Sequence, residues 1–548
     1  MSEDLASPSA SSRESSQVGG VIVRGIRAHL SFAALLAVLF LTFLDNTVAS
    51  AVLTSVQAKL HANVSQLQWV VGGYALAFAS LMLMFGALGD NFGRKRLMLI
   101  GVAVFCGGSI ICAIADNPSE LVIGRIIMGI GAAASEPATL SMIRHIYPDH
   151  KARARALGAW AAVTGLALAM GPIIGGILVG IWSWRAVFWF NLVFGALAFV
   201  IAAIALPESV NDLRKKVDFA GFFFGAVVLG TATFACIQGE LSGYESGWVI
   251  TLFIVSFLTI PVFYLAEKHA KDPMLEMGFF RRKSFTGSAF IAFASYFSIF
   301  SIFFFVALYL EVVVSVSAYG LALDFLPLLG GIVVASLFTG RWVGRIGSRI
   351  PMTVGCLLAG SGVLFTYWAI GPNVSLVTLG WTMGLAGVGF GIVIVPVNAT
   401  ALSSLPAANS GMASSAVNTS RELGAVAGVA ILGSIVNGQL TVNLTQRLIQ
   451  LGIPASFRSL VITAVTTGQT QQEEAGLNPA VKKQFAATIK KVINAAYGAL
   501  THGLDIALVA SALLLLVSAG VAYTTGTAER TELVDYVEPV HMATPAIS

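Results

Sequence analysis

The chain has 548 residues, of which 56% are hydrophobic and 11% are charged, and its formal net charge is +5. A soluble domain carries roughly 25% charged residues, so this composition excludes a soluble globular protein and indicates an all-α, polytopic membrane protein. The four cysteines lie in apolar runs without a CxxC pair, so we expect neither disulfide bonds nor a metal site.

The first stretch, residues 1–28, contains many serines, which predicts a disordered cytoplasmic tail rather than a cleaved signal peptide. Apolar runs follow, each of about the twenty residues that a helix needs to cross a bilayer. They predict fourteen spans, at residues 29–57, 67–88, 97–116, 119–146, 155–180, 184–206, 218–238, 248–267, 286–313, 319–342, 350–371, 375–402, 410–436 and 503–526.

Positive charge alternates from one predicted loop to the next. Because cationic loops stay on the cytoplasmic side during insertion, the clusters of lysine and arginine should face inward and both termini should be cytoplasmic. The short outer loops offer only Lys59 and Arg185. The inner segments carry Arg24 and Arg27, Arg94 to Arg96, Lys151, Arg153 and Arg155, Arg214 to Lys216, Lys268 and Lys271, Arg281 to Lys283, and Arg341, Arg345 and Arg349.

A weak internal repeat divides the chain into two halves. The spacing of the polar loop Gly86–Gly93 recurs at Gly340–Gly347, where Gly344 takes the place of the acid. Paired six-helix bundles with a site near the bilayer midplane are typical of secondary transporters. We therefore predict one bundle over 29–206, an inserted helix pair with its linkers over 207–285, a second bundle over 286–526, and a cytoplasmic tail over 527–548.

The long predicted outer loop, residues 437–502, contains a helical stretch that begins at Pro479. Apolar residues at helical spacing alternate there with four lysines. This pattern predicts an amphipathic helix that lies on the outer membrane surface. A helix packed on the outer mouth of the bundle is the alternative.

Charged residues inside predicted spans are expensive, so a functional role is their default interpretation. Asp45 lies in the middle of the first span and Arg125 in the outer part of the fourth, and we expect the two side chains to meet. Asp45 would then take up and release protons while Arg125 tunes it. The alternative is a static ion pair that fixes one helix against the other.

Glu136 lies on the same face of the fourth span as Arg125, three turns deeper and next to Pro137. It could bind a proton or a cation. The alternative is a protonated side chain that bonds to a neighbouring serine or threonine.

Two further spans carry candidates of a second rank. Asn418, Arg421 and Glu422 lie towards the cytoplasmic end of the thirteenth span, where an interfacial, structural role is possible. In the ninth span, one helical face carries several aromatic rings. This face either lines a substrate cavity or faces lipid, and it includes Phe297, Phe300 and Phe304.

Four motifs together resemble those of the major facilitator superfamily, and more narrowly its fourteen-helix, QacA-like drug:proton antiporters. They are the loop Gly86–Arg96, the stretch Leu44–Val48 around Asp45, the stretch Leu121–Gly131 and the stretch Gly165–Gly176. The resemblance covers nearly the whole chain. It implies the major facilitator fold, export by alternating access, and a proton gradient as the energy source without any cofactor.

The resemblance also assigns roles to two of the motifs. In the loop, Gly86, Asp90, Gly93 and Arg94 would form a latch that holds the two halves in one state. A plain positive-inside anchor is the alternative, but it does not explain Asp90 with its flanking glycines. The fifth-span motif would mark an exporter, with close packing and a bend at Gly165, Gly171, Pro172, Gly175 and Gly176.

These features favour a proton-coupled antiporter that exports lipophilic or cationic drugs and toxic compounds across a bacterial inner membrane. The alternatives are a dedicated exporter of one metabolite, siderophore or self-made toxin, and a lipid-handling or structural membrane protein without proton coupling. The sequence has no P-loop, HExxH motif or nucleophile elbow, so we expect neither an ATP-driven pump nor an enzyme.

The expected partners are lipophilic small molecules, protons and membrane lipids, but not nucleic acid, and we expect a monomer. Some QacA-like proteins have further acids in the second and tenth spans. Here the corresponding positions lie near Gly73 and Gly330. We therefore expect monocationic, zwitterionic or neutral lipophiles rather than dications.

Overall fold

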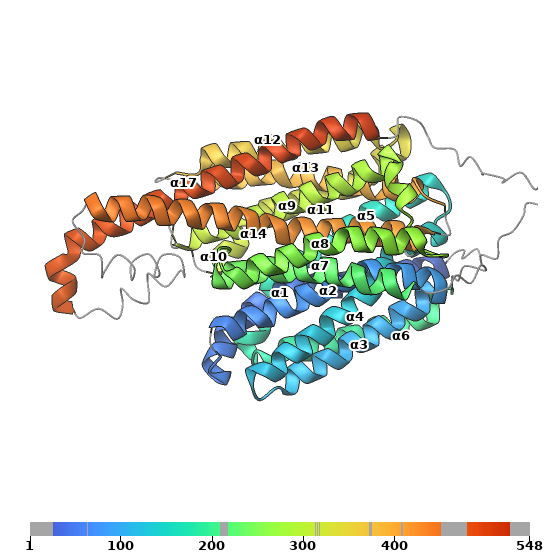
Figure 1. Ribbon diagram of the computed structural model, residues 1–548, viewed down its shortest axis with the longest axis horizontal. Helices are drawn as coiled ribbons and strands as arrows, with labels where there is room; N and C mark the ends of the chain where they lie inside the picture. The colour runs from blue at the N-terminus through green and yellow to red at the C-terminus, as the bar shows by residue number, and fades with distance from the viewer. Residues whose placement is uncertain are drawn as a thin grey trace, which may run out of the picture.

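The computed structural model describes residues 26–62, 64–208, 218–273, 275–312, 314, 316, 318–371, 375–406, 409–450 and 479–526. The predictions for residues 1–25, for residues 451–478 and for the tail 527–548 lie outside this part. Within it the chain is helical and has no strand (Figure 1).

The helices form two groups and a pair between them. We name the first group the N-half; it comprises α1 (Ile26–Leu60), α2 (Val64–Phe92), α3 (Arg94–Ile114), α4 (Pro118–Ile146), α5 (His150–Ile181) and α6 (Arg185–Ala205). The pair is α7 (Phe219–Ser242) and α8 (Gly247–His269), followed by the 3-10 turn η1 (Met277–Arg281). The second group, the C-half, comprises α9 (Lys283–Val312), α10 (Ala318–Asp324), α11 (Leu326–Ile346), α12 (Arg349–Ala369), α13 (Leu376–Ser403), α14 (Ser410–Gln450) and α17 (Pro479–Thr525).

Most of these helices are long and apolar enough to cross a membrane. In the described part of the chain, 13 helices meet this condition, and α5 makes 14 when its two bent pieces count as one span. The bend in α5 measures 41° and lies between Leu168 and Ile173. Gly171 and Pro172 occupy that point, and a proline bends a helix because it lacks an N–H and its ring clashes with the preceding turn. The predicted all-α membrane fold is confirmed.

The predicted tenth span, residues 319–342, is wrong in its bounds. The structure divides it into the short helix α10 and the span α11, which begins after Phe325 and continues to Ile346. Pro327 is in the first turn of α11. A proline favours that position because its missing N–H would have no partner there, so Pro327 suits the start of a new helix.

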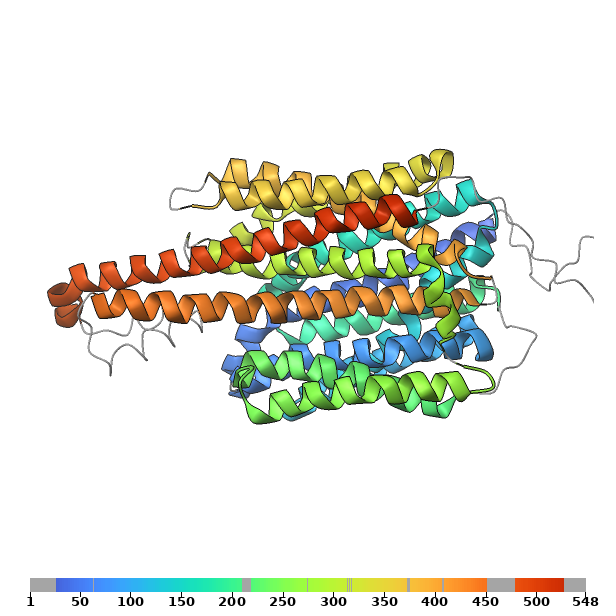
Figure 2. The same cartoon turned by 45° about the horizontal axis from the view of Figure 1, so that its top comes forward.

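The predicted loop 437–502 also differs from the structure. α14 continues past the membrane-spanning part to Gln450, and α17 runs without a break from Pro479 into the last span. The two helices project beyond the ends of the other helices (Figure 2). Leu444 and Leu448 of the projecting part are fully buried, and α14 packs on α17. The helix predicted after Pro479 is therefore an extension of the last span, and not a separate helix on the membrane surface.

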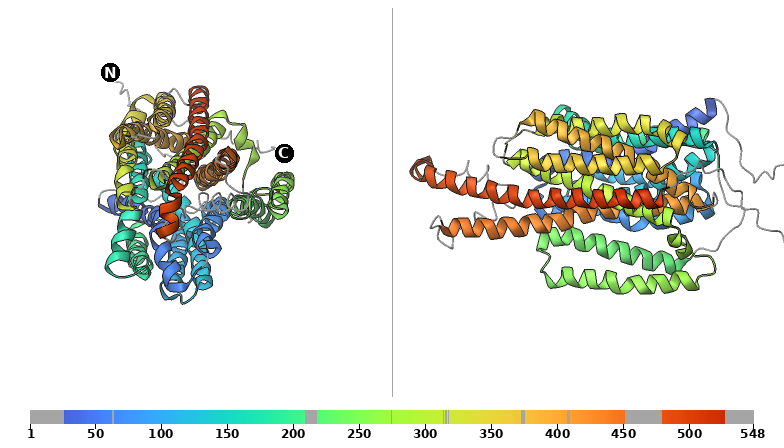
Figure 3. Two further views of the ribbon diagram at one scale, coloured as in Figure 1. Left: turned by 90° about the vertical axis from the view of Figure 1, so that its left-hand side faces the viewer. Right: turned by 90° about the horizontal axis from the view of Figure 1, so that it is seen from above.

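The halves meet along the helix pairs α5–α11, α2–α14, α4–α14 and α5–α13, with a smaller contact between α5 and α10. The pair α7–α8 lies at the edge, where α7 contacts α2 and α14 and α8 packs almost entirely on α7 (Figure 3). The interface between the halves thus runs through α2, α4 and α5 on one side and α11, α13 and α14 on the other.

One close helix contact inside the C-half leads to a testable prediction about the stability of the fold. A Cβ at Gly387 of α13 would overlap the backbone oxygen of Leu328 in α11. Gly387→Val should therefore cost about 1–3 kcal/mol of stability, seen as a lower thermal unfolding temperature in detergent. Gly330→Val is the matched control, because a Cβ there meets no atom within 4 Å. Equal unfolding temperatures for the two variants would contradict this account of the packing.

Candidate functional site

Asp45 and Arg125 form a fully buried ion pair inside the N-half. The Nη1 atom of Arg125 lies 2.5 Å from Oδ2 of Asp45, so the expected meeting of α1 and α4 is confirmed. The sequence did not indicate the other partners of this pair. Asn191 of α6 donates to Oδ1 of Asp45 at 2.7 Å, and Nε of Arg125 donates to the carbonyl of Val70 in α2 at 2.9 Å.

The pair and its partners thus join four helices, α1, α2, α4 and α6. The guanidinium of Arg125 also lies 4.5 Å from the ring centre of Tyr74, within the range of a cation–π interaction. Both charges are therefore well compensated by hydrogen bonds and by each other. A polar asparagine inside the sixth apolar run was the one signal in the sequence that could have revealed Asn191.

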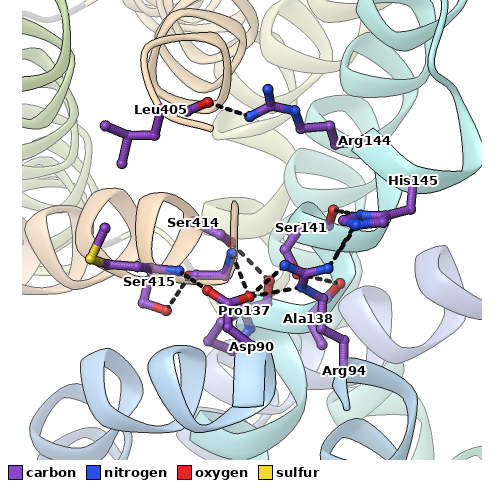
Figure 4. Close-up of polar contacts among 12 residues, drawn as sticks. Asp90, Arg94, Pro137, Ala138, Ser141, Arg144, His145, Leu405, Ser414 and Ser415 are labelled. Carbon is purple, nitrogen blue, oxygen red and sulfur yellow. Dashed lines mark hydrogen bonds and ion pairs between the residues drawn. The ribbon is translucent and has the colours of Figure 1, made fainter. Parts of the chain in front are cut away.

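The latch residues connect the two halves at the predicted cytoplasmic end (Figure 4). The carboxylate of Asp90 accepts hydrogen bonds from the backbone N–H groups of Gly411 and Met412, both at 3.0 Å, in the first turn of α14. Arg94 donates to Oδ1 of the same carboxylate from Nε at 2.9 Å and from Nη2 at 2.6 Å. A carboxylate at a helix N-terminus is favourable because the free N–H groups and the helix dipole point towards it.

Two glycines make this geometry possible. A Cβ at Gly86 would overlap the side chain of Ser415, so α2 and α14 can approach this closely only without one. Gly93, which precedes α3, has a φ of +104°, a backbone conformation that residues with a Cβ rarely adopt. The motif therefore shapes the contact between halves as well as supplying its charges.

His145 of α4 lies beside the latch, a contact that the sequence analysis missed. Its Nε2 atom is 2.8 Å from Nη1 of Arg94. Since a guanidinium only donates, the imidazole nitrogen must accept, and the ring is neutral in this arrangement. Arg144, the preceding residue, donates to the carbonyls of Leu402 and Leu405 in the C-half, the second at 2.8 Å. The bonds of Arg144 and of Asp90 thus join the two halves at this end.

Deeper in the interface, Glu136 of α4 forms an ion pair with the C-half. Its carboxylate accepts from Nδ2 of Asn418 at 2.7 Å and from Nη2 of Arg421 at 3.1 Å. The interfacial position suggested for Arg421 and Glu422 is wrong, because both side chains are buried. The sequence placed them near a helix end, but α14 leans against α2 and α4 there and removes them from the surface. The side chain of Glu136 bonds to an amide and a guanidinium, so the alternative of a serine or threonine partner is wrong.

Aromatic rings from three helices surround the guanidinium of Arg421. Its central carbon lies 5.7 Å from the ring centre of Phe43, 5.0 Å from Trp160 and 4.9 Å from Tyr296. A small cavity opens beside it and is also lined by Ser295 and Asn398. The cation thus lies in an aromatic cage at the centre of the interface.

The aromatic face predicted on α9 does not act as one surface. Phe297 is buried against α14, where the backbone of Gly428 approaches its carbonyl, and Phe300 is half-buried. Phe304 is 47% exposed. Tyr296, which the sequence analysis did not select, is the α9 ring that reaches the centre.

The glycines of the fifth-span motif have different surroundings. A Cβ at Gly171 would overlap Thr47 of α1, and a Cβ at Gly165 would lie 2.9 Å from Ile332 of α11. Gly175 is buried, whereas a Cβ at Gly176 would meet nothing within 4 Å. Close packing therefore explains Gly165 and Gly171 but not Gly176.

Comparisons with known proteins agree with this architecture. The Major Facilitator Superfamily model matches residues 35–429. The chain is similar to the methylenomycin A resistance protein of Bacillus subtilis, with 33% identity over 398 residues, which are 72% of this chain and 84% of that protein. It is also similar to the multidrug resistance protein Stp of Mycobacterium tuberculosis, with 30% identity over 410 residues, 75% of this chain and 76% of that one.

One further relative and one solved structure are similar to this chain over almost its full length. The tetracenomycin C resistance and export protein of Streptomyces glaucescens is 27% identical over 542 residues, 97% of this chain and 98% of that protein. The crystal structure of the human organic anion transporter MFSD10 superposes with a TM-score of 0.58 at 15% identity, covering 91% of this chain and all of the other. At that identity the second likeness concerns the fold alone.

Proposed function

Because this chain belongs to the major facilitator superfamily, we propose that it is a proton-coupled antiporter that exports lipophilic or cationic toxic compounds by alternating access. Its relatives include proteins named for drug and antibiotic resistance. We further propose a bacterial inner membrane, with both termini and the latch on the cytoplasmic side, in keeping with the distribution of lysine and arginine.

The observation that carries this proposal is the placement of buried acids at and beside the interface of the halves. Proton coupling requires a group whose protonation changes the relative stability of two arrangements of the protein. Glu136 binds across the interface to Arg421, and Asp45 fixes α1, which packs on the bent helix α5. Protonation of either acid would weaken an ion pair that orders the helices around the transport path.

The latch has a separate part in this scheme. Asp90 binds the first turn of α14 and Arg94 binds Asp90, away from the aromatic cage, so we assign both residues to the closed state and not to the substrate. Protons that enter down their gradient would open the buried pairs. The latch would then set how fast the cytoplasmic end closes and reopens.

Transport by the purified protein in liposomes tests the proposal. A pH gradient directed into the vesicles, with a panel of neutral and cationic lipophilic dyes, should drive transport, and a protonophore should abolish it. Transport at the same rate with and without the gradient would refute antiport. Empty liposomes with the same gradient measure passive partition of each dye.

A dedicated exporter is the second candidate, because two of the relatives are named for one compound each, methylenomycin A and tetracenomycin C. The same dye panel separates the two candidates. Transport of many unrelated dyes would favour the multidrug exporter. Transport of none, together with gradient-driven export of a single compound, would favour the dedicated one.

A further inference from the structure

Three side chains around the small cavity at the centre of the interface contain buried polar atoms without a hydrogen-bond partner. Among the described residues, none is found for Oγ of Ser295 on α9, for Oδ1 of Asn398 on α13, or for Nε and Nη1 of Arg421 on α14. The three residues line this one cavity and are no more than 2% exposed. Since buried polar groups are nearly always paired, this convergence beside a cavity indicates a binding site.

The other buried serines of α9 show that the state of Ser295 is an exception. Ser288, Ser298 and Ser301 each donate to the backbone carbonyl four residues earlier, which is the usual arrangement of a serine inside a helix. Ser298 also reaches the carbonyl of Ser511 in α17 at 3.3 Å. The hydroxyl of Ser295 makes no such bond, so it is available to a molecule in the cavity.

Arg421 has donors that its protein partners do not use. Its Nη2 atom bonds to Glu136 at 3.1 Å, and the rings of the aromatic cage attract the cation without accepting an N–H bond from it in the way an oxygen does. A guanidinium has five N–H donors, so those on Nε and Nη1 remain for an acceptor oxygen. The site therefore offers donors from Arg421 and Ser295 and one acceptor, Oδ1 of Asn398.

The charges at the cavity favour an uncharged ligand. Glu136 already binds Arg421, so a carboxylate on the ligand would bring a second negative charge to a single buried guanidinium. A cationic group would lie against that guanidinium, because Arg421 is the one charged residue among the described residues that line the cavity. Carbonyl and hydroxyl oxygens satisfy the open groups without either cost.

The remaining wall of the cavity is apolar. It consists of Ala292, Val393, Ile394 and Val397, together with the ring of Tyr296. An apolar wall with a few polar groups that fix the orientation is typical of a site for a small lipophilic molecule. The cavity is small in this arrangement, so it suits the polar group of a compound, whose apolar body needs the space that opens when the halves move apart.

We propose that Arg421, Ser295 and Asn398 form the subsite for the polar group of the exported compound, and that this compound is an uncharged lipophile with carbonyl and hydroxyl oxygens. A carbonyl oxygen accepts from the guanidinium and from the hydroxyl of Ser295, and a hydroxyl group of the ligand donates to Oδ1 of Asn398. This inference rests on the proposed export of lipophilic compounds. It narrows their class from lipophilic or cationic to uncharged and oxygen-bearing.

Competition for a bound fluorescent dye tests the substrate class in the full-length protein in lipid nanodiscs, without a proton gradient. Nile red is the dye, and the competitors share one ring skeleton: anthracene, hydroxymethylanthraquinone, anthracene carboxylate and anthracenylmethylammonium. Empty nanodiscs correct each concentration for partition into lipid. The quinone should displace Nile red with an inhibition constant at least about tenfold lower than those of the other three, because it alone has uncharged acceptor and donor oxygens.

Substitutions at the subsite should reduce the advantage of the quinone. Ser295→Ala and Asn398→Leu each remove one polar group and should raise its inhibition constant about three- to tenfold, while that of anthracene should change less than about twofold. Ser298→Ala is the matched control, because this serine is also buried on α9 but bonds to carbonyls of the protein. The ratio of the two constants does not depend on the affinity for Nile red, and misfolding would raise both together.

Equal inhibition by the quinone and by anthracene would overturn the inference, as would stronger inhibition by the carboxylate or by the ammonium compound. An unchanged ratio in both Ser295→Ala and Asn398→Leu would also overturn it, since these side chains would then not contact the ligand. The competition needs no gradient. Transport of the quinone at the same rate with and without a proton gradient would therefore refute the proposed function, whereas gradient-driven transport without any preference for the quinone would refute the subsite alone.

Discussion

Asp45→Asn should uncouple transport from the proton gradient. Asparagine keeps the size of the side chain and its hydrogen-bonding oxygen, but it cannot gain or lose a proton. Gradient-driven export in liposomes should fall about 100-fold, while exchange of substrate down its own gradient should continue. The measurement is the ratio of the two rates for the same preparation.

The alternative of a static ion pair makes a different prediction for the same variant. Removal of one partner of a buried pair typically costs about 3–5 kcal/mol, because the remaining charge is left uncompensated. Arg125 would then be stranded, and the variant should unfold at a lower temperature while the folded fraction still couples transport to protons. Asn191→Ala is the matched control, because it removes the second donor to Asp45 and leaves the acid able to ionise. Full coupling in Asp45→Asn would contradict the proton role.

Asp90→Ala should slow turnover and leave substrate binding intact. The variant removes the acceptor for the N–H groups of Gly411 and Met412 and for Arg94, all at one end of the interface. Hydrogen bonds to a charged group contribute about 1.5–3 kcal/mol each, so the closed state should be weakened enough to reduce the transport rate more than tenfold. Dye affinity, measured by fluorescence titration of the purified protein, should stay within about threefold of the parent.

A second substitution at the latch checks this assignment. Arg96→Gln removes a neighbouring cation whose side chain is 74% exposed and whose ion pair with Glu208 measures 3.4 Å, so it lowers the charge of the loop without touching the latch. If the loop were only a positive-inside anchor, Arg96→Gln and Asp90→Ala would have similarly small effects on the rate. Loss of dye binding in Asp90→Ala would show that the residue does more than hold the closed state.

The arrangement of spans could be predicted because it depends on local chemistry. Runs of apolar residues and the alternation of cationic loops set the number of helices, and both follow from the cost of moving charge and backbone polar groups into hydrocarbon. The errors lie where packing competes with that signal. Residues 319–342 break at Phe325 before Pro327, and the helix that begins at Pro479 continues into the last span.

For the candidate site, too, some features follow from the local sequence and others only from the tertiary structure. The sequence by itself determined that Asp45, Arg125 and Glu136 are charges inside the membrane, and that Asp90 and Arg94 belong to a glycine-rich loop, because each stands out against its immediate neighbours. Only the tertiary structure decided which charges meet. Asp45 pairs within the N-half, whereas Glu136 pairs across the interface with Arg421, a residue 285 positions away. The partner of each charge depends on how the helices of two separate bundles approach each other. A sequence pattern that repeats every few residues contains no information about which distant residues meet in space.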